Sequence, residues 1–384
     1  MVTSIINARI VYPESISDGN VIMENGKILA AGRVLPPRGA LVIDAKGSYA
    51  GPGFVDIHCH GGDRYTACDN PAEAAKYHLY FGTTSQVLSL GYGLSKENFF
   101  SGIENIKMAM EELDTNIIGI HFEGPYINPK YGVSSEKAWK MEKKDYQKMF
   151  LMAKGIVLQC TYAPEILGIE TYECYVKDQN AVLAVGHTEM SPEILDRAVR
   201  NGAVIVTHLF DAMGCHLGND SVSCTGIIQD TAADAVLARD DLFSELICDS
   251  RAIHVKASNL RIAYKALGAD KLILITDASV LNHNPSKYSL DDIRSSPDLN
   301  FNEAGVLCGS RLTMELACQN MKHYTNAGVL EIFKMASRNP AIALNIYENV
   351  GSLEAGKHAN IILCDENMVI SEVYFKGQPI RNKK

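Results

Sequence analysis

Basic residues are in short supply in this sequence. Its 36 lysines and arginines stand against 45 aspartates and glutamates, which gives a formal net charge of −9. Proteins that bind nucleic acids or acidic membrane surfaces need a basic face for those partners. The charge balance therefore argues against both kinds of partner.

The sequence also lacks the patterns of a disulfide framework, a leader peptide and a membrane span. Its 10 cysteines form no C-x-x-C pair and have no regular spacing, which is typical of buried thiols in a reducing compartment. Residues 1–5 show no basic region followed by an apolar one, and the apolar runs are too short to cross a bilayer. We expect a cytoplasmic protein.

The two ends of the chain share a strand-and-turn texture. Residues 5–11, 19–24 and 27–31 are strand-like, with a hairpin turn at 24–27. Residues 359–365 and 369–375 are similar, and a turn follows at 376–379. Neither end is long enough to bury a sheet alone. We therefore predict one small β-sandwich domain built from 1–52 and 351–384.

Between the two ends, apolar runs alternate with helical patterns. The runs are 54–60, 84–90, 117–123, 156–163, 181–187, 204–210, 246–249 and 272–277. Helical patterns include 97–113, 144–153, 191–201 and 253–267, the third of which begins with Ser191 as N-cap and Pro192 at the first helical position. Near-continuous apolar strands that alternate with helices indicate a parallel sheet covered by helices.

Eight such strands in 384 residues favour an α/β fold of the closed (β/α)₈, TIM-like type over 53–350. A doubly wound open sheet is the alternative, but the sequence has no G-x-G-x-x-G or Walker-type loop to support a nucleotide-binding version of it. In a (β/α)₈ barrel, function resides where the carboxyl ends of the strands meet.

Metal-ligand residue types stand at or near the ends of several predicted strands. They are His58, His60, Glu123, His187, His208 and Asp277. Imidazole and carboxylate ligands suit zinc or another divalent first-row metal, which can activate water near neutral pH. A carboxylate that is not needed as a ligand could take the proton of that water.

Each residue also has an ordinary structural interpretation. His121 could support the site or fill the barrel, and a strand-end aspartate such as Asp277 is often only a helix N-cap. His78 and His323 lie in helical stretches and are expected to be surface or packing residues. Chance is a poor explanation for the whole set, because its members follow separate predicted elements.

Residues 51–61, G-P-G-F-V-D-I-H-C-H-G, resemble the first-strand motif of the amidohydrolase superfamily. Within it, the chain is similar to the N-acetylglucosamine-6-phosphate deacetylase family. The motifs that carry this resemblance are H-F-E-G-P at 121–125, G-H-T at 186–188, T-H-L-F-D-A-M at 207–213 and I-T-D-A at 275–278. Later segments at 307–314, 339–341 and 351–357 agree, so the resemblance covers nearly the whole chain.

The resemblance implies a metal-dependent deacetylase, and a homodimer is expected. Glu123, His187 and His208 would hold the main metal, and His58 with His60 allow a second. Zinc is the expected metal, with iron, cobalt or manganese as alternatives. Asp277 would serve as general base and then as general acid. The expected substrate-binding residues are Ser134, Asp211, Ala212, Asn219, Arg251, His254 and Leu307.

Departures from the family pattern cluster on substrate recognition. Asp211 replaces an asparagine, Asn219 replaces an arginine that reaches a phosphate, and Ser134 is the nearest match to a family histidine. The chain also lacks a lysine at the end of the fourth run, so no carbamylated lysine is expected. A carboxylate in place of an amide and a lost arginine both disfavour a phosphate dianion, unless Arg251 compensates.

The sequence thus predicts a hydrolase that removes acetate from an N-acetyl amino sugar, a small-molecule substrate whose phosphate is in question. One alternative is an amidohydrolase that acts on an N-acyl amino acid or a cyclic amide. Another is a catalytically silent barrel retained for binding.

Overall fold

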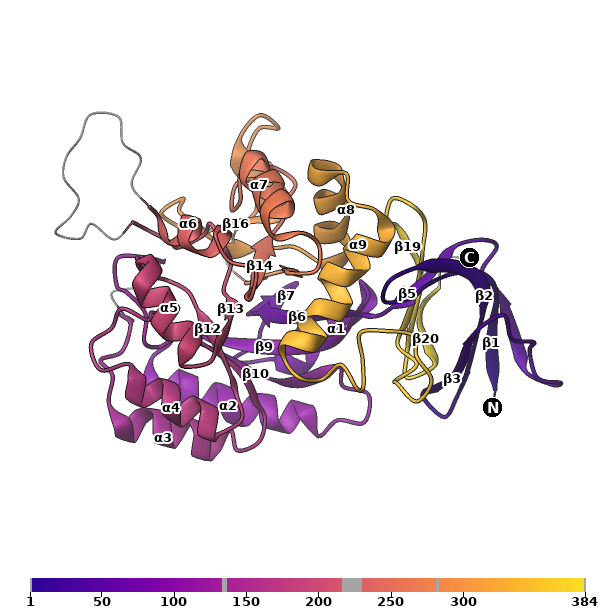
Figure 1. Cartoon of the computed structure of the whole chain (residues 1–384), viewed down its shortest axis with the longest axis horizontal. Coiled ribbons are helices and arrows are strands. Elements are labelled where there is room, and N and C mark those ends of the chain that lie inside the picture. The colour runs from indigo at the N-terminus through magenta and orange to yellow at the C-terminus, as the bar shows by residue number, and fades with distance from the viewer. Residues whose placement is uncertain (1, 133–136, 216–229, 281–282, 383–384) are drawn as a thin grey trace.

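The computed structural model describes residues 2–132, 137–215, 230–280 and 283–382. A barrel of parallel strands surrounded by helices forms its larger part, and a β-domain at one side contains both ends of the chain (Figure 1). The predicted fold class is confirmed. The boundaries drawn at 52/53 and 350/351 remain a proposal.

Eight strands form the barrel, and neighbours in the sheet follow chain order in parallel. They are β6 (Phe54–Cys59), β9 (Thr83–Gly91), β10 (Ile117–Glu123), β11 (Val157–Tyr162), β12 (Val182–Val185), β13 (Ala203–Val206), β14 (Phe243–Ile247) and β15 (Leu272–Ile275). A helix follows each strand: α1 (Pro71–Tyr80), α2 (Lys96–Met110), α3 (Lys143–Met152), α4 (Glu170–Asp178), α5 (Pro192–Arg200), α6 (Ala232–Leu237), α7 (Ala257–Leu267) and α8 (Met314–Thr325).

Local chemistry explains several of these boundaries. Helix α5 begins as predicted, since the Ser191 hydroxyl accepts the backbone N–H of Ile194 and Pro192 follows it.

Along β15, alternate side chains divide between two apolar cores. Ile273 and Ile275 belong to the core inside the barrel, whereas Leu272 and Leu274 face the core shared with the helices. Apolar side chains therefore fill the barrel interior beneath the mouth.

The barrel closes between its last and first strands through individual contacts. Within the described residues, β15 and β6 share no strand ladder. Instead, the Asp277 N–H donates to the His58 carbonyl at 2.9 Å. The Thr276 hydroxyl donates to the Asp56 carboxylate at 2.6 Å. This seam places Asp277 beside the histidines of the first strand.

The β-domain unites the two ends of the chain in one mixed sheet, with the order β20-β19-β18-β5-β1-β2-β3 and β4 paired to β1. Its strands are β1 (Thr3–Val11), β2 (Ile16–Glu24), β3 (Lys27–Gly32), β4 (Leu41–Asp44), β5 (Tyr49–Pro52), β18 (Ile361–Cys364), β19 (Ile370–Phe375) and β20 (Gln378–Asn382). The predicted turn between β2 and β3 is present, with Asn25 and Gly26 at positive φ values of 51° and 76°.

The remaining elements lie at the two ends of the barrel. Near the mouth are two short hairpins, β7–β8 (Gly61–Gly62, Tyr65–Thr66) and β16–β17 (Leu299–Phe301, Leu307–Ser310). Short 3₁₀ turns occur at Pro285–Lys287 and Ile293–Ser295. After α8 come α9 (Val329–Phe333), a π-helical turn (Lys334–Arg338) and α10 (Asn339–Ala343), whose apolar residues join the core inside the barrel.

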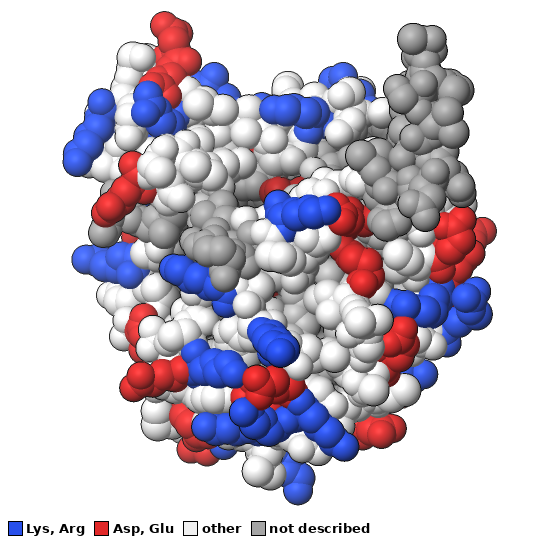
Figure 2. All heavy atoms as spheres, turned by 90° about the vertical axis from the view of Figure 1, so that its left-hand side faces the viewer, with Lys and Arg blue, Asp and Glu red and all other residues white. Residues whose placement is uncertain are grey.

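Figure 2 views the molecule from the side opposite the β-domain, and basic and acidic side chains are interspersed on this face. None of the described helices is long and apolar enough to span a bilayer. The nine described cysteines are free thiols.

Candidate metal centre

The predicted metal-ligand residues converge at the mouth of the barrel in two groups. The inner group consists of Glu123, His187 and His208, and the outer group of His58, His60 and Asp277. Within each group the potential ligand atoms all lie within 4.8 Å of one another. The structure therefore brings together all six residues that the strand ends predict.

Four of these residues follow their strands rather than ending them, which corrects the predicted strand limits. Strand β6 ends one residue before His60. Strands β12, β13 and β15 end two residues before His187, His208 and Asp277. These three residues have positive φ values of 49°, 30° and 44°, in the region that non-glycine residues rarely adopt. Such backbone conformations are common at functional sites, and here they turn the side chains toward the mouth.

The inner group is compact and buried. The Nε2 atom of His187 lies 2.8 Å from Oε1 of Glu123, and that of His208 lies 3.3 Å from the same oxygen. The two Nε2 atoms are 3.1 Å apart. Side-chain exposure is only 7% for Glu123, 4% for His187 and 3% for His208.

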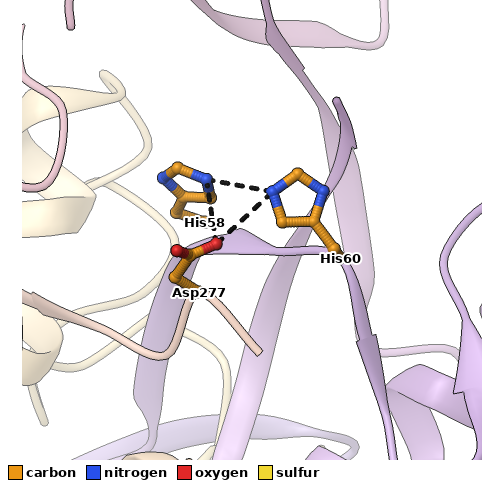
Figure 3. Close-up of side chains that lie close together, drawn as sticks. All are labelled: His58, His60 and Asp277. Atoms are coloured by element: carbon orange, nitrogen blue, oxygen red, sulfur yellow. Dashed lines mark hydrogen bonds and ion pairs between the residues drawn. The ribbon is translucent and has the colours of Figure 1, made fainter. Parts of the chain in front are cut away.

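The outer group is drawn in Figure 3. It lies next to the inner group, since Nε2 of His58 is 3.4 Å from Oε1 of Glu123, and it is more open. The Nε2 atoms of His58 and His60 are 3.2 Å apart, and each lies within 3.5 Å of Oδ1 of Asp277. His58 is fully buried, whereas the side chains of His60 and Asp277 are 20% and 12% exposed. Glu123 also reaches this group, with its Oε2 atom 3.1 Å from Nε2 of His60.

The hydrogen bonds of the two Nδ1 atoms in the inner group show which ring nitrogens are free to bind a metal. Nδ1 of His187 lies 3.2 Å from the Tyr131 carbonyl, and Nδ1 of His208 lies 3.1 Å from the Asp211 carbonyl. A carbonyl only accepts, so each Nδ1 carries the proton and each neutral ring presents the Nε2 lone pair to its neighbour. Lone pairs that face each other 3.1 Å apart need a shared cation, which fits a divalent metal.

The electrostatics of the site favour positive charge. Burial would lower the pKa of His208, but the hydrogen bond and charge of Glu123 outweigh it and raise that pKa to about 9. Burial likewise opposes protonation of His58, yet the charges of Asp277 and Glu123 raise its pKa well above the ordinary value. For Glu123, burial favours the neutral acid, but His60 and His58 hold the pKa of its carboxyl well below the usual range.

A cavity of ≈ 510 Å³ opens above the two groups. Four of the predicted substrate-binding residues line it: Asp211, Ala212, His254 and Leu307. Arg251 is exposed, is absent from the lining and donates to the Leu290 carbonyl at 3.0 Å. Ser134 and Asn219 lie outside the described residues.

His254 is held at both ring nitrogens. Its Nδ1 lies 3.1 Å from a carboxylate oxygen of Asp249, and its Nε2 lies 3.1 Å from the Gly309 carbonyl. Both partners are acceptors, so this arrangement requires a doubly protonated ring. Burial opposes that charge, but the hydrogen bond that His254 donates to Asp249 and the charge of Asp211 raise the pKa of His254.

Three residues that the sequence interpretation missed adjoin the site. Glu245, on β14, is fully buried and accepts from Nδ1 of His58 at 3.1 Å. A glutamate directly before the apolar run 246–249 was the available signal, since a buried charge needs a partner. Tyr92 and Cys308 line the cavity, where burial and the charge of Asp277 raise the pKa of the Cys308 thiol to about 11.

His121 supports the site from below, which is one of its two predicted roles. Its Nδ1 atom lies 2.9 Å from the Ser89 hydroxyl, and its Nε2 atom lies 2.8 Å from the Thr161 hydroxyl. Both ring nitrogens are therefore occupied within the barrel. The ring packs edge-on against His58, with 4.6 Å between the centroids.

Comparison with known proteins agrees with this geometry. The sequence profile of the amidohydrolase family matches residues 49–380. N-acetylglucosamine-6-phosphate deacetylase of Bacillus subtilis (strain 168) is 28% identical over 379 residues, which cover 95% of this chain and 93% of the relative. N-acetylgalactosamine-6-phosphate deacetylase of Escherichia coli O157:H7 is 23% identical, with 98% and 99% covered.

A solved structure shows the same fold. It is N-acetylglucosamine-6-phosphate deacetylase from Pasteurella multocida, which superimposes with a TM-score of 0.84 at 22% identity and covers 99% of both chains. The family profile spans the barrel strands that carry both ligand groups and continues into the C-terminal strands of the β-domain. This chain belongs to the amidohydrolase family.

Proposed function

We propose that this protein is a metal-dependent amide hydrolase that removes acetate from an N-acetyl amino sugar. The observation that carries the proposal is the sharing of Glu123 between two ligand groups, one of which contains Asp277 at the cavity floor. The names of the relatives, deacetylases of two N-acetylhexosamine phosphates, support the class of substrate.

The donor set suits one or two divalent cations, and we propose zinc, because imidazole nitrogen and carboxylate oxygen are its usual ligands beside thiolate. Glu123, His187 and His208 would hold one ion, and His58, His60 and Asp277 the other. A divalent ion at this place lowers the pKa of a water molecule and polarises an acyl carbonyl.

Asp277 is the proposed proton carrier. Its Oδ1 atom lies 3.4 Å from Nε2 of His60, and both residues line the cavity. From there the carboxylate can take a proton from the attacking water and deliver it to the departing amine nitrogen. Tyr92 packs edge-on against His187, with 4.7 Å between the ring centroids, and restricts water on that side of the site.

We further propose that the preferred substrate carries no phosphate, or carries its anion in a different position. The half-buried carboxylate of Asp211 lines the cavity, and Lys137 is the sole lysine or arginine among the described lining residues. An ionised Asp211 close to a phosphate dianion would repel it by on the order of a few kcal/mol in a partly dry site. The same carboxylate can accept hydrogen bonds from sugar hydroxyls.

The test is kcat/KM of the metal-loaded protein for N-acetylglucosamine 6-phosphate, the free sugar and other N-acetyl compounds. We expect the unphosphorylated compounds to be preferred. A double variant, Asp211→Asn with Asn219→Arg, should gain on the phosphosugar. Asp69→Asn is the matched control, because it removes a carboxylate from the cavity rim at another position.

Strong preference of the wild type for the phosphosugar, with no gain in the double variant, would refute the proposed preference for substrates without a 6-phosphate. Turnover of N-acyl amino acids or cyclic amides in place of sugars would favour the other amidohydrolase activities. A chain that folds without metal and turns over none of these compounds would be a silent barrel.

A further inference from the structure

Glu245 is a carboxylate enclosed in the barrel beneath the metal centre. It is fully buried and sits in the run Phe243–Ile247. Its Oε1 atom accepts from the Gln159 side-chain amide at 2.7 Å, and its Oε2 atom accepts from Nδ1 of His58 at 3.1 Å and from the His208 N–H at 3.3 Å. Three donors offset the high cost of burying a carboxylate.

The contact with His58 determines how that ring faces the outer group. With the Nδ1 proton donated to Glu245, the Nε2 lone pair points at His60 and Asp277 (Figure 3). The ring is fully buried, so water cannot replace Glu245 as the acceptor. A carboxylate partner also raises the basicity of a ligating imidazole more than a neutral acceptor does.

Among the residues that the structure describes, no side chain supports the rings of the inner group in this way. His187 and His208 donate their Nδ1 protons to backbone carbonyls, those of Tyr131 and Asp211. The contact of Glu245 with His208 is to its backbone N–H and leaves its ring untouched. Glu245 therefore contacts a ligand ring of the outer group, whereas its contact with the inner group is limited to one backbone N–H.

We propose that Glu245 is a positioning residue that sets, through His58, how tightly the outer group holds a divalent metal. The inference rests on the proposed function in one respect, namely that both groups hold metal. The buried carboxylate of Glu245 adds to those of Glu123 and Asp277, and together they would balance the charge of a second ion. Removing the Glu245 carboxylate should weaken binding of the outer ion and leave binding of the inner ion unchanged.

The experiment is metal removal, measured independently of activity. Zinc-loaded wild type and Glu245→Gln are equilibrated with increasing concentrations of a chelator, and zinc per chain is measured by mass spectrometry. Glu173→Gln is the matched control, because Glu173 is also fully buried and has its own amide partner, Asn201, away from the site. Substitution of a residue that hydrogen-bonds a metal-ligating imidazole typically weakens metal binding roughly 10–100-fold.

We expect Glu245→Gln to lose its first ion at about 10–100-fold lower chelator concentration, with the second ion and the Glu173→Gln control unchanged. Unchanged release of both ions would overturn the inference, as would equal weakening of both or a wild type that holds fewer than two ions. If Glu245→Gln does not fold, Glu245→Asp carries the same test, since it keeps the charge and shortens its reach to His58. A wild type that binds both ions but hydrolyses no N-acetyl compound would refute the proposed function and leave this comparison intact.

Discussion

The two ligand groups differ in how the protein holds them. In the inner group, the two histidines are fixed by backbone carbonyls, and every side chain is at most 7% exposed. In the outer group, His58 is fixed by the side chain of Glu245, and His60 is 20% exposed. The outer group also contains Asp277, the proposed proton carrier.

This difference indicates that the two groups would hold their ions with different strength. Backbone carbonyls come with the fold, so no single substitution removes the acceptors that orient His187 and His208. A side-chain acceptor such as Glu245 can be lost in one substitution, and the exposed edge of His60 is open to solvent. We therefore expect a firmly held inner ion and a more exchangeable outer ion close to the chemistry.

Glu123 joins the two groups, and its removal should have the largest effect. Its carboxylate oxygens lie 2.8 Å from Nε2 of His187 and 3.1 Å from Nε2 of His60. We expect Glu123→Gln to lose both ions and essentially all activity, whereas His187→Ala loses mainly the inner ion together with activity. Metal content and turnover of both variants, measured side by side, are the check. Full metal content in either variant would show that the assigned ligands are wrong.

Asp277→Asn should leave the inner ion in place and lower turnover. A general base typically contributes roughly 10²–10⁴-fold, and the amide cannot accept the proton. The measurement is kcat together with metal content, with circular dichroism as the control for folding. Near-normal turnover would remove Asp277 from the mechanism.

Protons should compete with metal at the inner group. The pKa of His208 is raised to about 9 in the metal-free site, and a ligand must be neutral to bind metal. Below that pH, binding an ion releases a proton, so the apparent affinity should rise about tenfold per pH unit between pH 7 and 9. Titration calorimetry in buffers of different ionisation enthalpy measures the released proton. An affinity that is flat over this range would contradict the raised pKa.

The smallest predicted effect concerns His78, which supports the outer group from α1. Its Nε2 donates to the Gly61 carbonyl at 3.0 Å, next to His60. Burial lowers the pKa of His78 to about 4, below its unfolded value of about 6.5. The contribution of neutral, buried His78 to the free energy of unfolding is therefore complete above pH 6.5 and is lost as the pH falls toward 4. Between pH 7 and 5 the loss should be about 2 kcal/mol.

Urea unfolding of wild type and His78→Gln at both pH values tests this, because glutamine keeps a donor but does not titrate. Burial raises the pKa of Asp56 to about 7, which works in the opposite direction and acts in both proteins. The measured quantity is therefore the difference between the two proteins in the unfolding free energy that each loses from pH 7 to pH 5. Equal losses of stability on acidification would contradict the assignment.

Much of the fold and of the site could be predicted from the sequence. All eight barrel strands overlap the predicted runs, and the candidate ligands that lie outside a strand follow its last residue by one or two positions. This worked because apolar runs alternate with helices, and because parallel strands in chain order bring their carboxyl ends together. The strand limits were wrong at His60, which comes one residue after β6, and at His187, His208 and Asp277, which have positive φ values and come two residues after their strands.

The sequence by itself determined the barrel, the ligand types and their common mouth, since those depend on periodicity and order along the chain. Only the tertiary structure decided which ligands share an ion and what orients each ring. Asp56 and Thr276, whose contact closes the barrel seam, lie 220 positions apart. Glu245 lies 187 positions from His58. Such pairings follow from strand register and from the curvature that closes the barrel, and neither can be read from a local pattern.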